Sequence, residues 1–264
     1  MSTSLAPEAT RTWRASRLLP AVVVFGALLL VWQVYVVASG VRPQVLPAPS
    51  RVLAQGWSHR GDLAMHAMST LTVTLVGFAV SLAFAWAVAI AVDFSDWLQR
   101  ALVPLFVVSQ TLPIIAIAPL LIIWFGFGLL PKVVVVALVT FFPVAIGLIE
   151  GFAATDRDAV ALLRSMGASK WTRFRYVRLP SAMPRFFTAL RIGVTYAVVG
   201  AVFAEYVGAR SGLGIYMAQQ KNAFRTDLVL AAVAVTAAIT IVLFVSTYAI
   251  EKIVAPWALA ERSM

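Results

Sequence analysis

The residues whose types and spacing could support a chemical role gather between Arg164 and Ile192, in RSMGASKWTRFRYVRLPSAMPRFFTALRI. Seven lysines and arginines lie between Arg157 and Arg185, mixed with large apolar side chains. Such a mixture suits non-covalent docking to another protein better than bond-making chemistry. A solvated positive loop would explain the charges but not the Trp, Phe and Met. The composition therefore favours a docking element.

Large apolar residues recur at helical spacing on both sides of Gly167. They fall three apart as Val160, Leu163 and Met166 before the glycine, and as Trp171, Phe174 and Val177 after it. Three-residue spacing is typical of one helix face, and glycine commonly interrupts a helix. The pattern predicts two short amphipathic helices joined by a turn.

Residues for bond-making catalysis are missing from the sequence. No G-x-x-x-x-G-K-[ST] phosphate loop occurs, so an ATPase that drives this protein would be another polypeptide. His59 and His66 have no H-E-x-x-H context. His59 precedes the second predicted span and His66 lies at its start, which we expect to project beyond the hydrocarbon, so neither could serve an intramembrane serine protease. The chain also has no cysteine. We expect no catalytic, metal-binding or cofactor-binding residue.

The composition indicates a membrane protein. The 264 residues are 61% hydrophobic and 12% charged, with a mean hydropathy of +0.91. A membrane-spanning helix needs about 20 apolar residues. Six stretches qualify, and no alternating pattern suggests a barrel. The predicted fold is an all-α polytopic membrane protein with six transmembrane helices at about 18–39, 64–92, 98–125, 131–150, 182–206 and 228–250.

The uneven placement of lysine and arginine along the chain, whose net charge is +10, predicts an orientation in the membrane. Arg11, Arg14 and Arg17 precede the first span, and the basic cluster follows the fourth. The positive-inside rule then places both termini, 1–17 and 251–264, in the cytoplasm. The positive charge faces anionic lipid headgroups. We expect no nucleic-acid partner, because no platform of aromatic and basic residues is present.

The apolar run 18–39 is longer than a signal peptide's apolar core of about 7–15 residues, so we expect it to be retained. The outer loop 40–63 holds three prolines and then a short amphipathic run that Ser50 could cap.

The third span carries Pro104, Pro113 and Pro119, with Gln110 and Thr111 just before the second of them. A broken helix with polar neighbours at membrane depth is a pointer to a translocation path, although a kink packed against other helices is an open alternative. The candidate path residues are Gln110, Thr111, Pro113, Thr140, Thr195, Tyr196 and Glu205.

Two ionisable residues border the fifth span. Arg191 either has a function or simply extends its guanidinium toward the cytoplasmic surface. Glu205 is interfacial, pairs with Arg210 or lines an outer mouth, and these alternatives stay open.

The basic segment resembles the cytoplasmic coupling loop of permease subunits of ATP-binding-cassette (ABC) importers. That loop reads Glu-Ala-Ala, three residues, Gly, nine residues, Ile, one residue, Leu-Pro. Gly167 and Leu179-Pro180 match, Val177 takes the Ile place, and Ala161-Leu162-Leu163 replaces Glu-Ala-Ala. The resemblance implies an ATPase-coupling set within 151–181, made of Ala161, Leu162, Leu163, Met166, Gly167, Ala168, Trp171, Phe174, Val177, Leu179 and Pro180.

Further segments look like the branch of these importers that handles nitrate, taurine and alkanesulfonates. They are LPAPSRV at 46–52, the stretch 109–143 with FGFGLLPK, and GAVFAEYVGARSGLGIYM at 200–217. The sub-branch for pyrimidine precursors of thiamine looks most similar, with riboflavin permeases as neighbours. The resemblance implies the type I ABC importer permease fold over 64–250, in the bacterial inner membrane.

The resemblance also implies partners and a function. A second, identical permease copy, two cytoplasmic ATP-binding subunits that hold ATP and Mg, and an outer solute-binding protein complete the importer. The expected substrate is a hydroxymethylpyrimidine-type thiamine precursor, with taurine, alkanesulfonate, nitrate or riboflavin as alternatives. A secondary transporter or channel is the alternative class, but the first, third and sixth spans have no charged residue at their centres.

Overall fold

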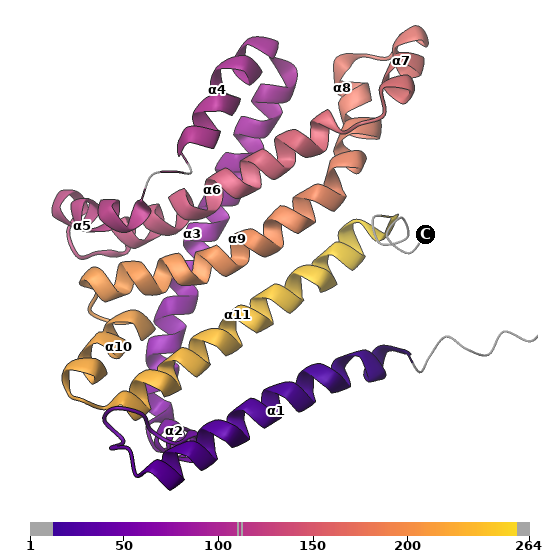
Figure 1. The fold of residues 1–264 in the computed structure, drawn as a ribbon. Helices are drawn as coiled ribbons and strands as arrows, with labels where there is room; N and C mark the ends of the chain where they lie inside the picture. The colour runs from indigo at the N-terminus through magenta and orange to yellow at the C-terminus, as the bar shows by residue number, and fades with distance from the viewer. Residues whose placement is uncertain (1–12, 110, 112, 258–264) are drawn as a thin grey trace, which may run out of the picture.

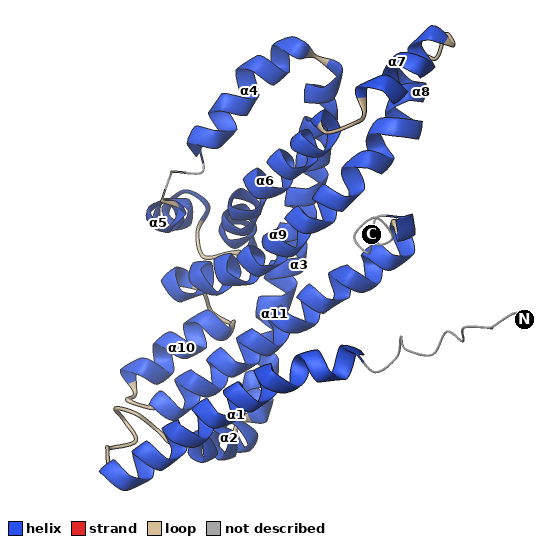
Figure 2. Cartoon of the chain, turned by 45° about the vertical axis from the view of Figure 1, so that its right-hand side comes forward, coloured by secondary structure: helices blue, strands red, loops and turns tan. Residues whose placement is uncertain are grey.

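The computed structural model describes residues 13–109, 111 and 113–257. Within these ranges every regular element is helical and no strand occurs (Figure 2). In chain order the elements are α1 (Trp13–Ser39), α2 (Pro49–Ser58), α3 (Arg60–Phe94), α4 (Asp96–Ser109), α5 (Ile114–Phe125), α6 (Leu129–Ala153), α7 (Arg157–Ser165), α8 (Lys170–Arg173), the π-helical turn η1 (Phe174–Arg178), α9 (Leu179–Gly208), α10 (Leu213–Asn222) and α11 (Thr226–Val254).

Five helical stretches of the described chain are long and apolar enough to cross a membrane. Four of them, α1, α3, α6 and α11, extend beyond the predicted spans by a few residues at one or both ends. The fifth runs without interruption from Lys170 to Gly208, through α8, η1 and α9. The predicted end of the coupling loop at 181 and start of a span at 182 therefore do not correspond to a break in the helix.

The third predicted span is two helices, α4 and α5, which meet at an angle (Figure 1). Pro113 precedes α5 in an extended conformation, whereas Pro104 and Pro119 lie inside their helices. Of the three prolines, only Pro113 coincides with the break, where its missing N–H and ring disfavour a continuous helix. Thr111 is exposed at the break, and Gln110 lies outside the described residues.

The core of the protein forms where α3, α6 and α9 cross. Small residues let these helices approach closely, as is common between membrane helices. A Cβ atom on Gly147 would lie 2.5 Å from the Cβ of Ala189, and one on Gly151 would lie 2.9 Å from that of Ala182. The close contact fixes α6 against α9, and these two helices lead into and out of the basic segment.

Helices α11 and α1 lie outside this core. α11 packs against α9, α10 and the short α2, while the described contacts of α1 are made mainly with α2 (Figure 1). Almost every described side chain of α1 is exposed. An apolar helix with so little buried surface presents its side chains to lipid or to a partner chain.

Two short helices differ from the sequence expectations. α2 begins at Pro49 with Ala48 as its N-cap, so Ser50 does not cap it. The Ser50 backbone N–H instead donates to Gln33 Oε1 at 3.1 Å. Proline is well suited to the first position of a helix, because it needs no hydrogen-bond acceptor there. α10 lies between the fifth and sixth predicted spans, where no helix is predicted from the sequence.

Candidate functional site

The basic segment folds as two helices around a glycine turn. α7 starts after Asp156, whose carboxylate accepts a hydrogen bond from the Asp158 N–H at 2.9 Å. α8 starts after Ser169, whose Oγ accepts from the Thr172 N–H at 3.1 Å. Both side chains satisfy donors that a helix start leaves free. The sequence prediction of a helix on each side of Gly167 agrees with this, except that the second helix continues into α9.

Gly167 closes α7 with a Schellman motif. Its φ is +79°, which L-amino acids with a Cβ rarely adopt. The Ala168 N–H donates to the Leu163 carbonyl at 2.9 Å, and the Gly167 N–H to the Arg164 carbonyl at 3.1 Å. This pair of bonds defines the motif and satisfies the last carbonyls of the helix. The turn between α7 and α8 thus depends on the backbone freedom of one residue.

For the importer function that the resemblance implies, Gly167→Ala is expected to lower uptake, and Gly167→Asn to lower it less. No atom lies within 4 Å of a Cβ built on Gly167, so the cost is purely conformational, about 1–2 kcal/mol. That corresponds to roughly a 5- to 30-fold shift toward a misformed turn. Asparagine tolerates positive φ better than alanine. Uptake rates of the two variants at equal expression test this, and equal rates for both would contradict it.

An aromatic cluster fixes the segment to the membrane helices. Phe174 is 4% exposed, and its ring centroid lies 5.5 Å from that of Phe94 in α3 and 5.3 Å from that of Phe152 in α6. Arg178 forms a salt bridge with Asp93, also in α3. Phe174 therefore packs in the protein interior, and its place in the ATPase-coupling set stays a prediction. Its three-residue spacing from Trp171 does not place both rings on one exposed surface.

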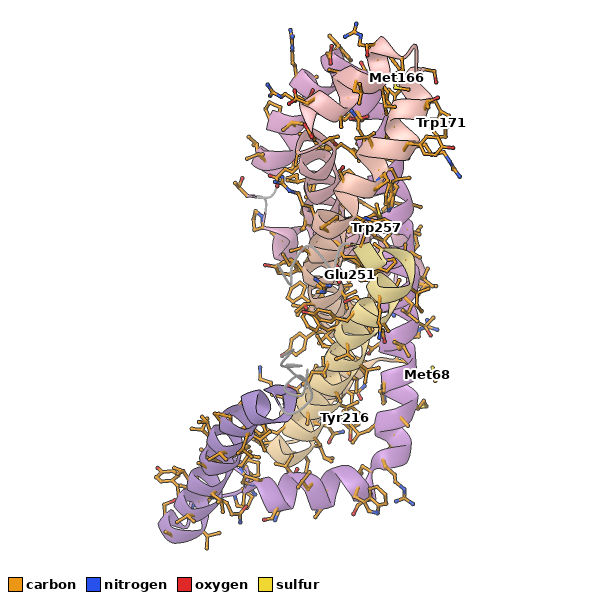
Figure 3. The ribbon with its side chains drawn as sticks, turned by 90° about the vertical axis from the view of Figure 1, so that its right-hand side faces the viewer. Met68, Met166, Trp171, Tyr216, Glu251 and Trp257 are labelled. Carbon is orange, nitrogen blue, oxygen red and sulfur yellow. The ribbon has the colours of Figure 1, made fainter. Side chains whose placement is uncertain are left out.

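Three of the exposed large apolar residues of the segment, Leu162, Met166 and Trp171, make up what we call the docking face. Their exposed fractions are 63%, 73% and 59%. Met166 and Trp171 lie near the upper end of the molecule as drawn in Figure 3. Ala161 and Gly167 beside them are also exposed, whereas the other predicted coupling residues, Leu163, Ala168, Val177, Leu179 and Pro180, are half-buried. Large exposed apolar side chains that gather at one end of the molecule indicate a protein-binding surface.

The predicted path residues separate into two groups. Thr111, Pro113, Thr195 and Tyr196 are exposed. Thr140 and Glu205 are completely buried within the chain, so neither can line a path in this conformation. The Thr140 hydroxyl donates to the Val136 carbonyl one turn earlier at 2.8 Å, which explains how it is satisfied inside the core.

Glu205 holds the start of α10 instead. Its Oε2 accepts hydrogen bonds from Thr70 Oγ1 at 2.8 Å and from the Gly214 N–H at 3.1 Å. None of the three sequence alternatives describes this role, and Arg210 is not its partner. Negative charge at a helix start is favourable, because the helix dipole is positive there.

Two more side chains complete this support. The Leu213 N–H donates to Thr70 Oγ1 at 2.8 Å, and the Gly212 N–H to His66 Nδ1 at 3.0 Å. Gly212 has a φ of +124°, and a Cβ on it would lie 2.1 Å from the Glu205 carboxyl carbon. The only sequence signal for this arrangement was the run Ser211-Gly212-Leu213-Gly214 after a glutamate.

Arg191 is buried rather than extended toward the cytoplasm. It forms a salt bridge with Glu251, and its guanidinium lies 3.9 Å from the ring centroid of Tyr248. Glu251 is a completely buried residue of α11, so α11 continues into what was predicted as the cytoplasmic tail. The pair joins α9 to α11. Within the described residues, no three His, Cys, Asp or Glu side chains gather as metal ligands would.

Comparisons with known proteins identify the family. The family described as binding-protein-dependent transport system inner membrane component matches residues 79–259. The riboflavin transport system permease protein RibX of Chloroflexus aurantiacus is 36% identical over 87% of each chain. The formylaminopyrimidine transport permease protein ThiX of Halalkalibacterium halodurans is 32% identical, over 88% of this chain and 93% of ThiX. The taurine transport system permease protein TauC of Escherichia coli is 30% identical, over 87% of this chain and 86% of TauC.

Solved structures show the same fold. The chain superposes with a TM-score of 0.54 on a chain of the MetNI methionine ABC transporter in inward-facing conformations, at 18% identity over 73% of this chain and 96% of the other. The superposition on a chain of an amino acid ABC transporter has a TM-score of 0.58 at 16% identity, and it covers 78% of this chain and 96% of the other. The fold prediction of a type I importer permease is confirmed. By its family match over more than half of its length, this multi-pass protein belongs to the inner membrane permeases of ABC importers.

Proposed function

We propose that this permease imports a hydroxymethylpyrimidine-type precursor of thiamine. The observation that carries the proposal is the neutral, hydrogen-bonding character of the exposed candidate path residues, Thr111, Thr195 and Tyr196. An anion at membrane depth would call for a compensating charge. A flat, neutral heteroaromatic ring is matched by hydroxyls and an aromatic side chain. The 32% identity to the formylaminopyrimidine permease supports the same substrate class.

Riboflavin is a second candidate. The riboflavin permease RibX is 36% identical to this chain, and riboflavin also contains a flat nitrogen heteroaromatic ring. The path residues named above suit either compound. Taurine and alkanesulfonates remain less favoured, because the proposed path offers no exposed cation.

The proposal includes the partners of the permease. Two copies of this chain enclose the path, and two cytoplasmic subunits that bind ATP and Mg supply the hydrolysis. An outer solute-binding protein delivers the substrate. The docking face transmits closure of the ATP-binding subunits, because α8 is continuous with the membrane helix α9 and α7 follows α6. A rigid connection of this kind lets partners bias a helix bundle between two arrangements.

Growth tests the substrate. In a strain that cannot make the pyrimidine, deletion of this gene is expected to abolish rescue by low concentrations of the hydroxymethylpyrimidine. A plasmid copy should restore rescue, and a copy carrying Trp171→Asp should not. Persisting rescue, together with lost growth on riboflavin in a riboflavin auxotroph, would move the assignment to the second candidate. Lost growth on taurine alone would contradict both.

Cysteine labelling tests the proposed orientation, with both termini in the cytoplasm. The chain has no cysteine, so single replacements at the exposed Ser58 and Ser169 report without background. In sealed cells an impermeant maleimide is expected to label Ser58→Cys and to leave Ser169→Cys unlabelled until the membrane is opened. The reverse pattern would invert the topology and place the docking face outside the cell.

A further inference from the structure

A cavity of about 650 Å³ opens beside the first turn of α6, at the other end of that helix from the basic segment. α3, the turn before α6 and the loop before α10 line it with Ser69, Thr72, Val73, Phe127, Gly128, Leu129, Lys132, Arg210 and Ser211. None of these lining residues is acidic. The cavity therefore has two cations and three hydroxyls on its wall, beside an apolar rim.

Lys132 is a cation on the cavity wall without an acceptor among the described residues. It is only 7% exposed, yet its ammonium makes no salt bridge and no hydrogen bond to the described residues. The acidic residue near it is Glu205, whose Oε2 already accepts hydrogen bonds from Thr70 and Gly214. An ammonium has three N–H donors and no acceptor, so donors without a protein partner at the cavity wall favour an anionic group.

The remaining wall fits the same chemistry. Arg210 is exposed and adds a second cation from the loop. Ser69 and Ser211 bond to each other through their hydroxyls at 2.9 Å, which joins that loop to α3. Phe127 and Leu129 are 63% and 47% exposed beside the cations. Cations next to exposed apolar side chains match a molecule with an anionic group and an apolar body.

We propose that this cavity binds a small organic anion, with Lys132 and Arg210 holding its carboxylate, sulfonate or phosphate group. The apolar part of the ligand lies against Phe127 and Leu129. The site goes beyond the proposed function, because a hydroxymethylpyrimidine has no negative charge and the cavity does not include Thr111, Thr195 or Tyr196.

The test uses full-length protein in nanodiscs of neutral phosphatidylcholine. Benzoate and benzenesulfonate serve as probes, and benzamide is the neutral control of the same shape. The thermal unfolding midpoint is measured against probe concentration at constant ionic strength, since a ligand of the folded state raises it. We expect a saturable rise with both anions and none with benzamide.

Variants then locate the response. Lys132→Gln and Arg210→Gln are each expected to weaken benzoate binding by about tenfold, as loss of a charge-assisted hydrogen bond does. Lys221→Gln, which removes an exposed cation of α10 outside the cavity, should bind as the unmodified protein does. Arg210 is exposed, so its variant remains informative if Lys132→Gln does not fold.

Three outcomes would overturn the proposal. The first is a rise of the unfolding midpoint with benzamide that equals the rise with benzoate. The second is benzoate binding by Arg210→Gln that is as tight as that of the unmodified protein. The third is a midpoint that rises only when the nanodiscs contain anionic lipid. The last result would assign the cations to lipid headgroups. The assay involves no transport, so its failure leaves the substrate proposal untouched, and failed growth rescue leaves this site untouched.

Discussion

Trp171→Asp is expected to abolish ATP-driven uptake while the permease still inserts into the membrane. Trp171 is 59% exposed on the docking face, and its ring stacks on Phe174, whose centroid lies 5.5 Å away. A large aromatic held in place by its neighbours is the kind of residue that dominates an interface. Its loss commonly costs about 2 kcal/mol or more, which weakens assembly by more than about tenfold.

A matched exposed tryptophan provides the control for this experiment. Trp97 is 74% exposed in the first turn of α4, outside the docking face, where an aspartate is compatible with the helix dipole. Trp97→Asp should therefore retain more uptake than Trp171→Asp. Co-purification of the ATP-binding subunit and uptake are measured for both at equal membrane levels. If Trp171→Asp co-purifies and transports normally, the docking face does not couple the subunits.

Glu251→Ala is expected to be among the most destabilising single substitutions, by about 3–5 kcal/mol. The substitution removes the carboxylate that forms a salt bridge with Arg191. Arg191 is a residue of α9 and is only 7% exposed. A buried guanidinium that loses its counter-charge is costly, because the surrounding protein and lipid solvate it poorly. The loss would also loosen α11 from α9.

Replacing both partners separates the ion pair from the packing. The double variant Arg191→Met, Glu251→Met should recover much of the stability that Glu251→Ala loses, since no buried charge is left alone. Glu150→Ala removes an exposed carboxylate in the last turn of α6 and should change stability little. Unfolding midpoints in detergent compare the three variants. A Glu251→Ala midpoint equal to that of Glu150→Ala would contradict the role of the pair.

Properties that depend only on residues close together in the sequence were predictable from the sequence. The apolar length of each span predicts a membrane helix, because about 20 residues are needed whatever the tertiary contacts are. Gly167 predicted a helix end for a similarly local reason, since only a residue that tolerates positive φ closes the Schellman motif. The spacing of Val177, Leu179 and Pro180 from that glycine then indicated the family, which the comparisons confirm.

The tertiary structure decided which side of each helix is buried. Trp171 and Phe174 are both aromatic and lie three residues apart, and both contact Phe94, yet Phe174 is 4% exposed whereas Trp171 is 59% exposed. The same holds for Thr140, whose hydroxyl suited a polar path as well as the core position it occupies. Burial depends on the helix that packs opposite, and a periodic pattern in one helix does not identify that helix.

Pairings between polar residues that are distant in the sequence also had to come from the fold. Arg191 and Glu251 are 60 residues apart, and Thr70 and Glu205 are 135 apart. Sequence rules for ionisable residues in membranes predict only that each needs a partner or an aqueous outlet. Which partner each residue has depends on how α3, α9 and α11 cross, and the crossing is set by close contacts such as that of Gly151 with Ala182. The chain by itself determined its helices and its turn, and the three-dimensional packing determined the partners, because Coulomb and hydrogen-bond energies depend on distance in space and not on separation in sequence.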